Sequence, residues 1–412
     1  MYLNLQSLGP EYKRFNNPRL ISAPPDLFPV YAYLYHMSTN KIRRFTKGTF
    51  ILANLFTAIL FLLGCFSVYF NPKHFWFIGF FTLASFYLLL VLVFFIFFWL
   101  FVKPRYLFIS IIAIAVAIQP LKHLLQLRLT PNFTAAKHPA NMRIMSWNVE
   151  HFDIREHKTH PERKQEMIDI INQHQPDVAC FQEMVASDSV PGAINYIPDF
   201  QQKLGMPNYH YSYNKKLDFD NSHHFGLIIF SKYPIIARHT LSYAPNDYNS
   251  IFQYADIVKG ADTFRIFNVH LQSLKFDDNN MRYLEQPSLK DEINIKESKS
   301  LISKLKTGFI KRQVQSEHIR RAIEASPYPV IVCGDFNDVP NSYAYSTIGK
   351  GLKNAFAEKG TGIGRTFYSI SPTLRIDNIF ADKRFSIEQF VRVKKKLSDH
   401  FPLVADLFYG KN

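Results

Sequence analysis

The chain has 412 residues, 47% of them hydrophobic, and a formal net charge of +15 at pH 7. Its basic residues are unevenly distributed, because 13 of the 48 Lys/Arg but only 2 of the 33 Asp/Glu residues precede residue 141. The remainder has a surplus of only four positive charges. This composition excludes a uniformly basic nucleic-acid-binding protein, and basic residues beside apolar segments are instead typical of a membrane protein.

Three apolar runs occupy the first third of the chain. Residues 50–70 and 75–102 contain no charged side chain, and each is long enough to cross a bilayer, which takes about 20 residues. The third run, 106–118, is shorter, so it is either a third span or an interfacial or re-entrant segment. The sequence therefore predicts a transmembrane region at 48–128 with about three helices.

Basic residues also predict the orientation of these helices. Seven Lys/Arg precede residue 48, whereas the loop between the first two runs has Lys73 alone. The positive-inside rule therefore places an N-terminal segment, 1–47, in the cytoplasm. Three spans put the rest of the chain on the extracytoplasmic side of a cell membrane, and two spans leave it in the cytoplasm. A basic stretch that starts at Met37 suggests that translation begins there.

A linker at 129–141 is predicted to precede a globular domain at 142–412. Two segments have helical periodicity, 163–174 and 295–325, the second interrupted near Gly308 within a surface excursion at 286–325. Apolar runs typical of strands alternate with them, at 143–147, 178–181, 225–230, 252–258, 264–269, 330–333 and 376–380. The pattern indicates an α/β or α+β domain with many strands.

Polar residues end or interrupt several of these predicted strands. Acidic side chains in such apolar surroundings are costly unless they are paired, hydrogen-bonded or bound to metal. Carboxylate, amide and imidazole groups together suit Mg²⁺ or Mn²⁺ better than Zn²⁺. The hydrolysis of a phosphate ester needs a cation, a base and donors to the phosphoryl oxygens, and the residues that supply such groups are Asn148, Glu183, His270, Asp335, Asn337, Asp377, Asp399 and His400.

The motifs that contain these residues occur in the order SWN, QE, NxHL, GDFN, RIDxIF and SDHxPL. In this order they resemble those of the endonuclease/exonuclease/phosphatase superfamily, and the resemblance covers Met142 to Tyr409. It implies a four-layer α/β (α+β) sandwich of the DNase I-like kind. It also implies a divalent-metal-dependent hydrolase of phosphate esters, here preceded by transmembrane helices.

The resemblance also implies a metal site for Mg²⁺ or Mn²⁺. Glu183 corresponds to the direct ligand of that site. Asn148 matches a second metal-site residue, and Asp399 matches an additional acid of the metal shell.

Five further residues receive catalytic roles from the resemblance. His400 is the general base or a histidine that contacts the phosphate, and Asp377 orients it. Asp335 positions or deprotonates the nucleophilic water. Asn337 donates a hydrogen bond to the phosphate, and His270 stabilises the pentacovalent transition state. The resemblance leaves open whether His400 or Asp335 takes the proton of the water.

Several alternatives remain at this level. Taken alone, Asn148 is also compatible with a turn, and Asp377 with an ion pair to Arg375. Asp338 is expected to be a turn residue, and the run 394–396 a solvated loop. The substrate is a nucleic acid or a phospholipid head group, or, for a phosphatase of the same superfamily, a lipid, inositol or sugar phosphate. A catalytically inactive membrane-bound binding module is the alternative from another class.

Overall fold

The computed structural model describes residues 28–128, 132–152, 158–187, 193–213, 223–242, 251–274, 280 and 292–410. The chain divides into two compact units, Met1–Phe56 and Thr57–Asn412. Part of the predicted N-terminal segment, 1–27, and part of the predicted linker, 129–131, lie outside the described residues. The proposed start at Met37 stays a prediction.

The described part of the N-terminal third is mostly helical. It contains α1 (Phe28–Cys65), α2 (Pro72–Phe75), α3 (Ile78–Val102), α4 (Leu107–Val116) and α5 (Ile118–Leu124). Ile42–Cys65 and Ile78–Val102 are long and apolar enough to cross a membrane, and the pair Pro104–Val116 and Ile118–Leu124, bent by 68°, provides a third span if both parts belong to it. The structure thus contains the two predicted transmembrane helices. It also contains the third segment, as a bent pair of helices whose assignment as a span stays open.

The first sheet of the globular part is formed by β1 (Met142–Asn148), β2 (Val178–Ser187), β3 (Asn208–Tyr213), β4 (His223–Ser231), β11 (Phe385–Arg392) and β12 (Leu403–Tyr409). Its strand order is β11-β12-β1-β2-β4-β3. Strands β1 and β2 are parallel, and the other neighbours are antiparallel. The two central strands therefore end at the same edge.

The second sheet is formed by β5 (Ile235–Ser242), β6 (Ile251–Lys259), β7 (Asp262–His270), β8 (Val330–Asp335), β9 (Leu352–Asn354) and β10 (Asp377–Asp382). Its strand order is β5-β6-β7-β8-β10-β9. Here β7 and β8 are the parallel pair. Each sheet thus has one central parallel pair within an otherwise antiparallel arrangement.

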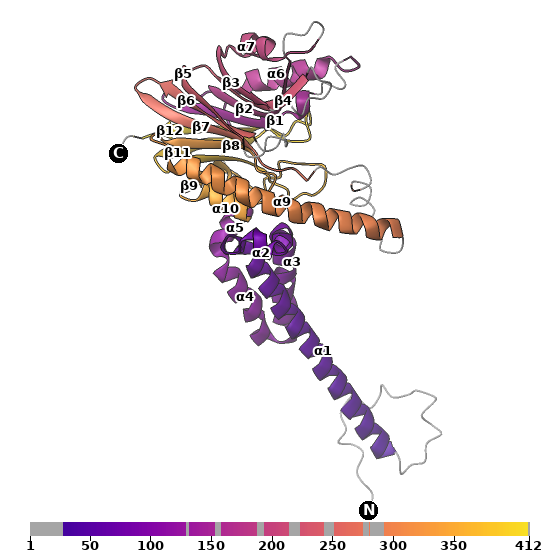
Figure 1. Cartoon of the computed structure of the whole chain (residues 1–412). Coiled ribbons are helices and arrows are strands. Elements are labelled where there is room, and N and C mark those ends of the chain that lie inside the picture. Colours follow the sequence, from indigo (N-terminus) through magenta and orange to yellow (C-terminus); the bar gives the residue numbers. More distant parts are fainter. Residues whose placement is uncertain are drawn as a thin grey trace, which may run out of the picture. The chain divides into compact units, whose positions relative to one another are not determined.

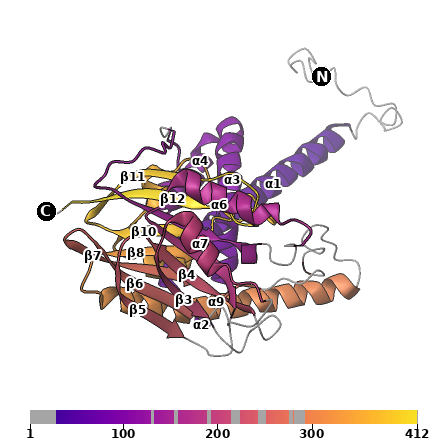
Figure 2. The ribbon, with the colours of Figure 1, turned by 90° about the horizontal axis from the view of Figure 1, so that it is seen from above.

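Helices cover the outer faces of both sheets (Figure 1). The first sheet packs on α6 (Glu162–His174) and α7 (Ile197–Leu204), and the second on α9 (Glu292–Glu324) and α10 (Tyr343–Gly349). Between the sheets lies a third apolar core, in which Ile144 and Cys180 face Ile331 and Cys333. The predicted four-layer sandwich is confirmed, and in the view from above α6 and α7 lie in front of the strands (Figure 2).

All seven predicted strands and both predicted helices are present. The predicted interruption near Gly308 is wrong, because α9 runs without a break from Glu292 to Glu324. A Cβ at Gly308 would lie 2.6 Å from Leu274 Cδ2, so the glycine permits close packing rather than ending the helix. The second half of α9 is also no surface excursion, since Ile319 and Ile323 are buried against the second sheet.

Candidate active site

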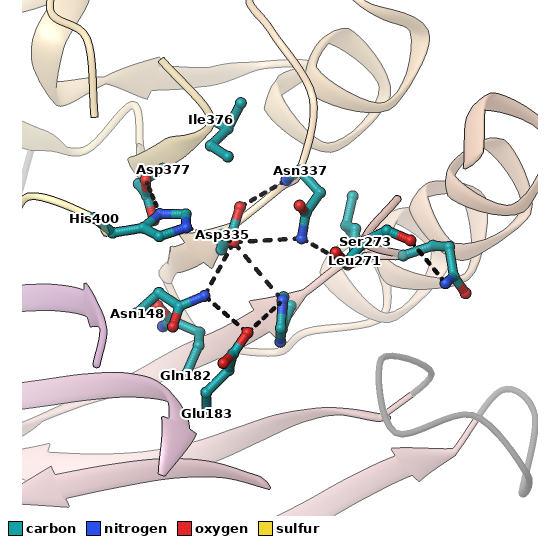
Figure 3. A network of polar contacts seen from close by, with 12 residues as sticks. Asn148, Gln182, Glu183, Leu271, Ser273, Asp335, Asn337, Ile376, Asp377 and His400 are labelled. Atoms are coloured by element: carbon teal, nitrogen blue, oxygen red, sulfur yellow. Dashed lines mark hydrogen bonds and ion pairs between the residues drawn. The ribbon is translucent and has the colours of Figure 1, made fainter. Parts of the chain in front are cut away.

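Asp335 lies at the end of β8, between polar residues of both neighbouring strands. In the parallel register His270 of β7 is opposite Asp335, and in the antiparallel register Asp377 of β10 is opposite the same residue. Strand pairing alone therefore brings these three side chains to one edge of the second sheet, although 107 residues separate Asp377 from His270. Figure 3 shows Asp335 and Asp377 there. All three are buried.

The close approach of β7 and β8 at this edge requires the glycine that precedes Asp335. Gly334 has φ +141°, a conformation that side chains rarely adopt, and a Cβ there would lie 1.9 Å from the carbonyl oxygen of Val269. The Gly-Asp pair in the motif thus has a structural origin.

The first sheet contributes Asn148 and Glu183. Asn148 ends β1 opposite Gln182 of β2, and Glu183 follows where the register of β2 and β4 shifts. Glu183 has φ 57°, an uncommon conformation for a non-glycine residue that directs its side chain toward the site. Asn148 Nδ2 lies 3.3 Å from Glu183 Oε1 and 3.2 Å from Asp335 Oδ2, so that it connects the two sheets.

Two histidines approach the same oxygen of Asp335. His270 Nε2 is 3.7 Å from Asp335 Oδ2 and 3.8 Å from Glu183 Oε1. His400 Nε2 is 3.7 Å from the same Asp335 oxygen. These separations are longer than direct hydrogen bonds.

The other ring nitrogen of His400 is held by Asp377. The Nδ1–Oδ2 distance is 2.8 Å. The backbone N–H of Asp377 donates to Thr366 Oγ1 at 3.1 Å, and the indole of Trp147 donates to the carbonyl of His400 at 2.9 Å. The predicted His–Asp pair is therefore present and is fixed on both sides, whereas the alternative pairing of Asp377 with Arg375 is not seen.

Asn337 forms a turn beside Asp335. Its backbone N–H donates to Asp335 Oδ1 at 2.7 Å, and its Nδ2 donates to the carbonyl of Leu271 at 3.0 Å. The neighbouring Asp338 is buried 3.1 Å from the Arg312 Nε of α9. Asp338 is thus a structural residue, in line with its expected position in a turn.

Two further side chains near Glu183 and Asp399, those of Glu150 and His151, were not predicted from the sequence. Glu150 Oε2 accepts a hydrogen bond from the backbone N–H of Asp399 at 2.9 Å, and His151 Nδ1 is 3.4 Å from Glu183 Oε2. Burial, followed by the charges of Asp399 and Glu183, raises the pKa of the Glu150 carboxyl. The available signal was the position of Glu150, two residues after Asn148.

The donor set fits a divalent cation. One ligand atom each from Asp335, Asp377 and His400 lie within 4.8 Å of one another. Among the described residues, Asp377 Oδ1 is buried without a hydrogen-bond partner, and a buried carboxylate oxygen in that state is stabilised by a cation or a proton. Buried carboxylates with amide and imidazole neighbours are the ligands of hard divalent metals.

The sequence profile of the Endonuclease/Exonuclease/phosphatase family matches residues 145–400, which include all eight predicted site residues. The chain belongs to this family. A second profile, that of a domain of unknown function (DUF8431), matches residues 47–124. No curated protein matches the sequence.

Several solved structures are similar to this chain in fold. The chain is 16% identical to the family protein from Bacteroides thetaiotaomicron, with a TM-score of 0.47, covering 67% of this chain and 100% of that one. It is 20% identical to the protein from Bacteroides vulgatus (TM-score 0.46; 66% and 99%). It is 18% identical to the human Nocturnin catalytic domain with a bound sulfate anion (TM-score 0.44; 67% and 97%).

The electrostatics of this family member separate its site groups. Burial raises the pKa of Asp335 to about 7, and the nearby charge of Asp377 adds to the rise. Burial alone would lower the pKa of His400, but the carboxylates of Asp377 and Asp335 raise it well above its ordinary value. Burial would raise the pKa of Glu183, yet His151, His270 and Asn148 lower it. Glu183 is therefore ionised at neutral pH, whereas Asp335, with a pKa of about 7, can gain or lose a proton at that pH.

These shifts predict how the stability of the metal-free protein depends on pH. In the unfolded chain, Asp335 loses its proton at about pH 4 and His400 at about pH 6.5. In the folded chain both side chains keep their protons to a higher pH. The contribution of Asp335 to the free energy of unfolding therefore falls as the pH rises from about 4 through 7, and that of His400 falls above about pH 6.5. We expect a lower melting temperature at pH 8 than at pH 6 for the full chain in EDTA, measured by thermal unfolding in detergent.

The matched variant is Asp335→Asn, which cannot ionise at this position. Its melting temperature should change less between the two pH values than that of the unaltered chain. An equal or larger change in Asp335→Asn would contradict the assignment of the proton to Asp335.

Proposed function

We propose that the chain is a divalent-metal-dependent hydrolase of phosphate esters of the phosphodiesterase or nuclease type, anchored in a membrane. The observation that carries the proposal is the convergence on Asp335 Oδ2 of nitrogen atoms from Asn148, His270 and His400, at 3.2, 3.7 and 3.7 Å. A phosphoryl oxygen placed beside Asp335 would be within reach of the same amide and imidazole groups, which are the donors that its developing negative charge requires.

Glu183 would hold the cation, Mg²⁺ or Mn²⁺, with Asn148 and Asp399 as further metal-site residues. When bound, the cation neutralises charge on the phosphoryl oxygens. The low pKa of Glu183 supports this assignment, because an ionised carboxylate is the better ligand. The group Asp335, Asp377 and His400 is the alternative ligand set.

Two of the remaining residues, Asp335 and His400, then carry out the proton transfers. Asp335 accepts the proton of the attacking water, for which a pKa of about 7 is suited at neutral pH. His400, kept protonated by its carboxylate neighbours and oriented by Asp377, donates to a phosphoryl oxygen. Asn337 and His270 supply further hydrogen bonds. The water oxygen forms a new bond to phosphorus while the bond from phosphorus to the ester oxygen breaks. The leaving oxygen takes up a proton from bulk water, to which Asp335 returns the proton that it accepted.

Two other functions follow from the same residues. A phosphatase of lipid, inositol or sugar phosphates would use the same site, because the catalytic groups do not distinguish monoesters from diesters. An inactive binding module is opposed by the complete set of eight side chains and by the intact pair of His400 and Asp377.

We also propose that the catalytic domain is extracytoplasmic. Asn341 accepts a hydrogen bond at its carbonyl from Ser67 at 2.6 Å and donates from Nδ2 to the carbonyl of Pro120 at 3.0 Å. The loop after α1 and the helix α5 therefore lie on the same side as the catalytic domain. Basic residues before the first span place the opposite side in the cytoplasm.

The experiment that tests this function uses the full chain in detergent with bis(para-nitrophenyl) phosphate, para-nitrophenyl phosphate, plasmid DNA and single-stranded RNA. We expect turnover of the bis-ester only with Mg²⁺ or Mn²⁺, and none in Glu183→Gln. The matched control is Glu388→Gln, an exposed glutamate of β11, which should retain full turnover. Metal-independent turnover, or turnover that survives in Glu183→Gln, would contradict the proposal.

A further inference from the structure

Residues 366–373 form a short segment, here named the wall segment, that borders His400. Phe367 pairs with His400 in an isolated bridge, and their rings are 5.0 Å apart. The backbone N–H of Tyr368 donates to the carbonyl of Asp399 at 3.3 Å, and its ring packs 5.2 Å from that of Phe401. The wall segment is therefore one side of the candidate active site.

The other end of the wall segment reaches an apolar helix. Ser371 Oγ is 3.0 Å from the hydroxyl of Tyr87 in α3. Ser371 is four residues from Phe367, so these two backbones are separated by at most about 14 Å even if the segment is fully extended. The reacting side chains are thus close to the flank of a helix that is long and apolar enough to span a membrane.

Tyr87 lies well inside that helix. It is the tenth residue of the 25-residue α3, about 14 Å along a helix of about 37 Å. The hydrocarbon core of a bilayer is about 30 Å thick, and Trp76, just before α3, is typical of the boundary with water. Because Ser371 contacts Tyr87, the wall segment therefore lies at the depth of the lipid head groups or below it.

Other contacts prevent the domain from turning its site away. Phe309 of α9 packs against the start of α3, where a Cβ on Gly79 would lie 2.6 Å from its ring, and Lys306 Nζ lies 5.1 Å from the centre of the Trp76 ring. Asn341 donates a hydrogen bond to the carbonyl of Pro120 in α5. Contacts at the start of α3, at its middle and at α5 together fix the orientation of the catalytic domain on the helices.

From this orientation we infer that the site receives its substrate laterally from the bilayer, and that the substrate is the phosphate ester of a membrane lipid. The inference rests on the proposed phosphoesterase function. Charge supports it, because Lys396 Nζ lies 5.1 Å from the ring of Tyr368 on the wall segment, and Lys394 and Lys395 are exposed beside it. Basic residues at a membrane surface attract anionic head groups.

A depth measurement tests the position of the wall segment without using activity. The full chain is reconstituted in vesicles with equal parts of phosphatidylcholine, phosphatidylethanolamine, phosphatidylglycerol and sphingomyelin, and Ser371→Cys carries a fluorophore. Gln202→Cys, on an exposed position of α7, is the matched control, and the native cysteines are buried. Nitroxide-labelled lipids should quench the label at 371 and not at 202. Quenching at 371 by aqueous iodide alone would overturn the inference.

A second measurement tests the substrate in the same vesicles. We expect the release of phosphorus-containing head groups or water-soluble head-group products, lost in Glu183→Gln. Turnover of bis(para-nitrophenyl) phosphate or plasmid DNA without any lipid turnover would overturn the lipid substrate but leave the proposed hydrolase intact. No turnover of any substrate, the bis-ester included, would overturn the proposed function itself.

Discussion

Replacing Asp335 with asparagine is expected to lower kcat by about 10²–10⁴-fold, the range in which a general base contributes to catalysis. The amide keeps the shape of the side chain but cannot accept the proton of water. Because burial raises the pKa of Asp335 to about 7, its ionisation is unfavourable in the folded chain. The variant should therefore melt at the same temperature as the unaltered protein, or higher, when both are measured in EDTA at pH 8.

The combination of lost activity and retained stability is what identifies a catalytic carboxylate. The control is Asp382→Asn, which removes a partly exposed carboxylate that pairs with Arg384 at 2.8 Å. This control should retain activity within about threefold, since it lies at the far end of β10. Near-full activity in Asp335→Asn, with a normal melting curve, would refute the assigned role.

Removing divalent cations is expected to abolish hydrolysis, and Mg²⁺ or Mn²⁺ should restore it after dialysis. The folded chain should also melt at a higher temperature with metal. Binding to the native state alone stabilises it by about 2.7 kcal/mol at a metal concentration of 100 times Kd. Activity that persists in EDTA after dialysis would exclude the proposed chemistry.

The two candidate ligand sets give different results in this experiment. If Glu183 is the direct ligand, Glu183→Gln loses the metal-dependent increase in melting temperature and Asp377→Asn retains most of it. If the cation is instead bound by Asp335, Asp377 and His400, Asp377→Asn loses the metal-dependent increase in melting temperature and Glu183→Gln retains most of it. The measurement is thermal unfolding of the full chain over a series of Mn²⁺ concentrations.

The site was predictable from the sequence where polar residues end apolar strands. Asn148 and Asp335 are recognisable because an apolar run changes abruptly to polar residues, and parallel pairing then brings such ends to one edge. The motif order added His400 and Asp377, whose 2.8 Å contact confirms the predicted pair. The roles of these residues in catalysis stay predictions.

Other parts depend on contacts between distant residues that no local pattern indicates. Strand β12 was not predicted because Asp406 interrupts its apolar run, and its partner Arg143, at 2.6 Å, is 263 residues away in the sequence. Glu150 lies in a left-handed stretch after β1 and acquires its place through Asp399, near the end of the chain. The edge strand β3 does alternate, but its buried positions are the polar residues His210 and Ser212 and its tyrosines are more exposed, which is the reverse of the usual pattern.

The position of β12 has a consequence for biosynthesis. This strand is formed by Leu403–Tyr409, yet it lies between β11 and β1, next to the first strand of the domain. The first sheet therefore cannot close until almost the whole chain has left the ribosome, long after the N-terminal helices have been made. The first sheet is thus incomplete during synthesis, which is compatible with the proposed extracytoplasmic location, because a translocation channel can move a domain that has not finished folding.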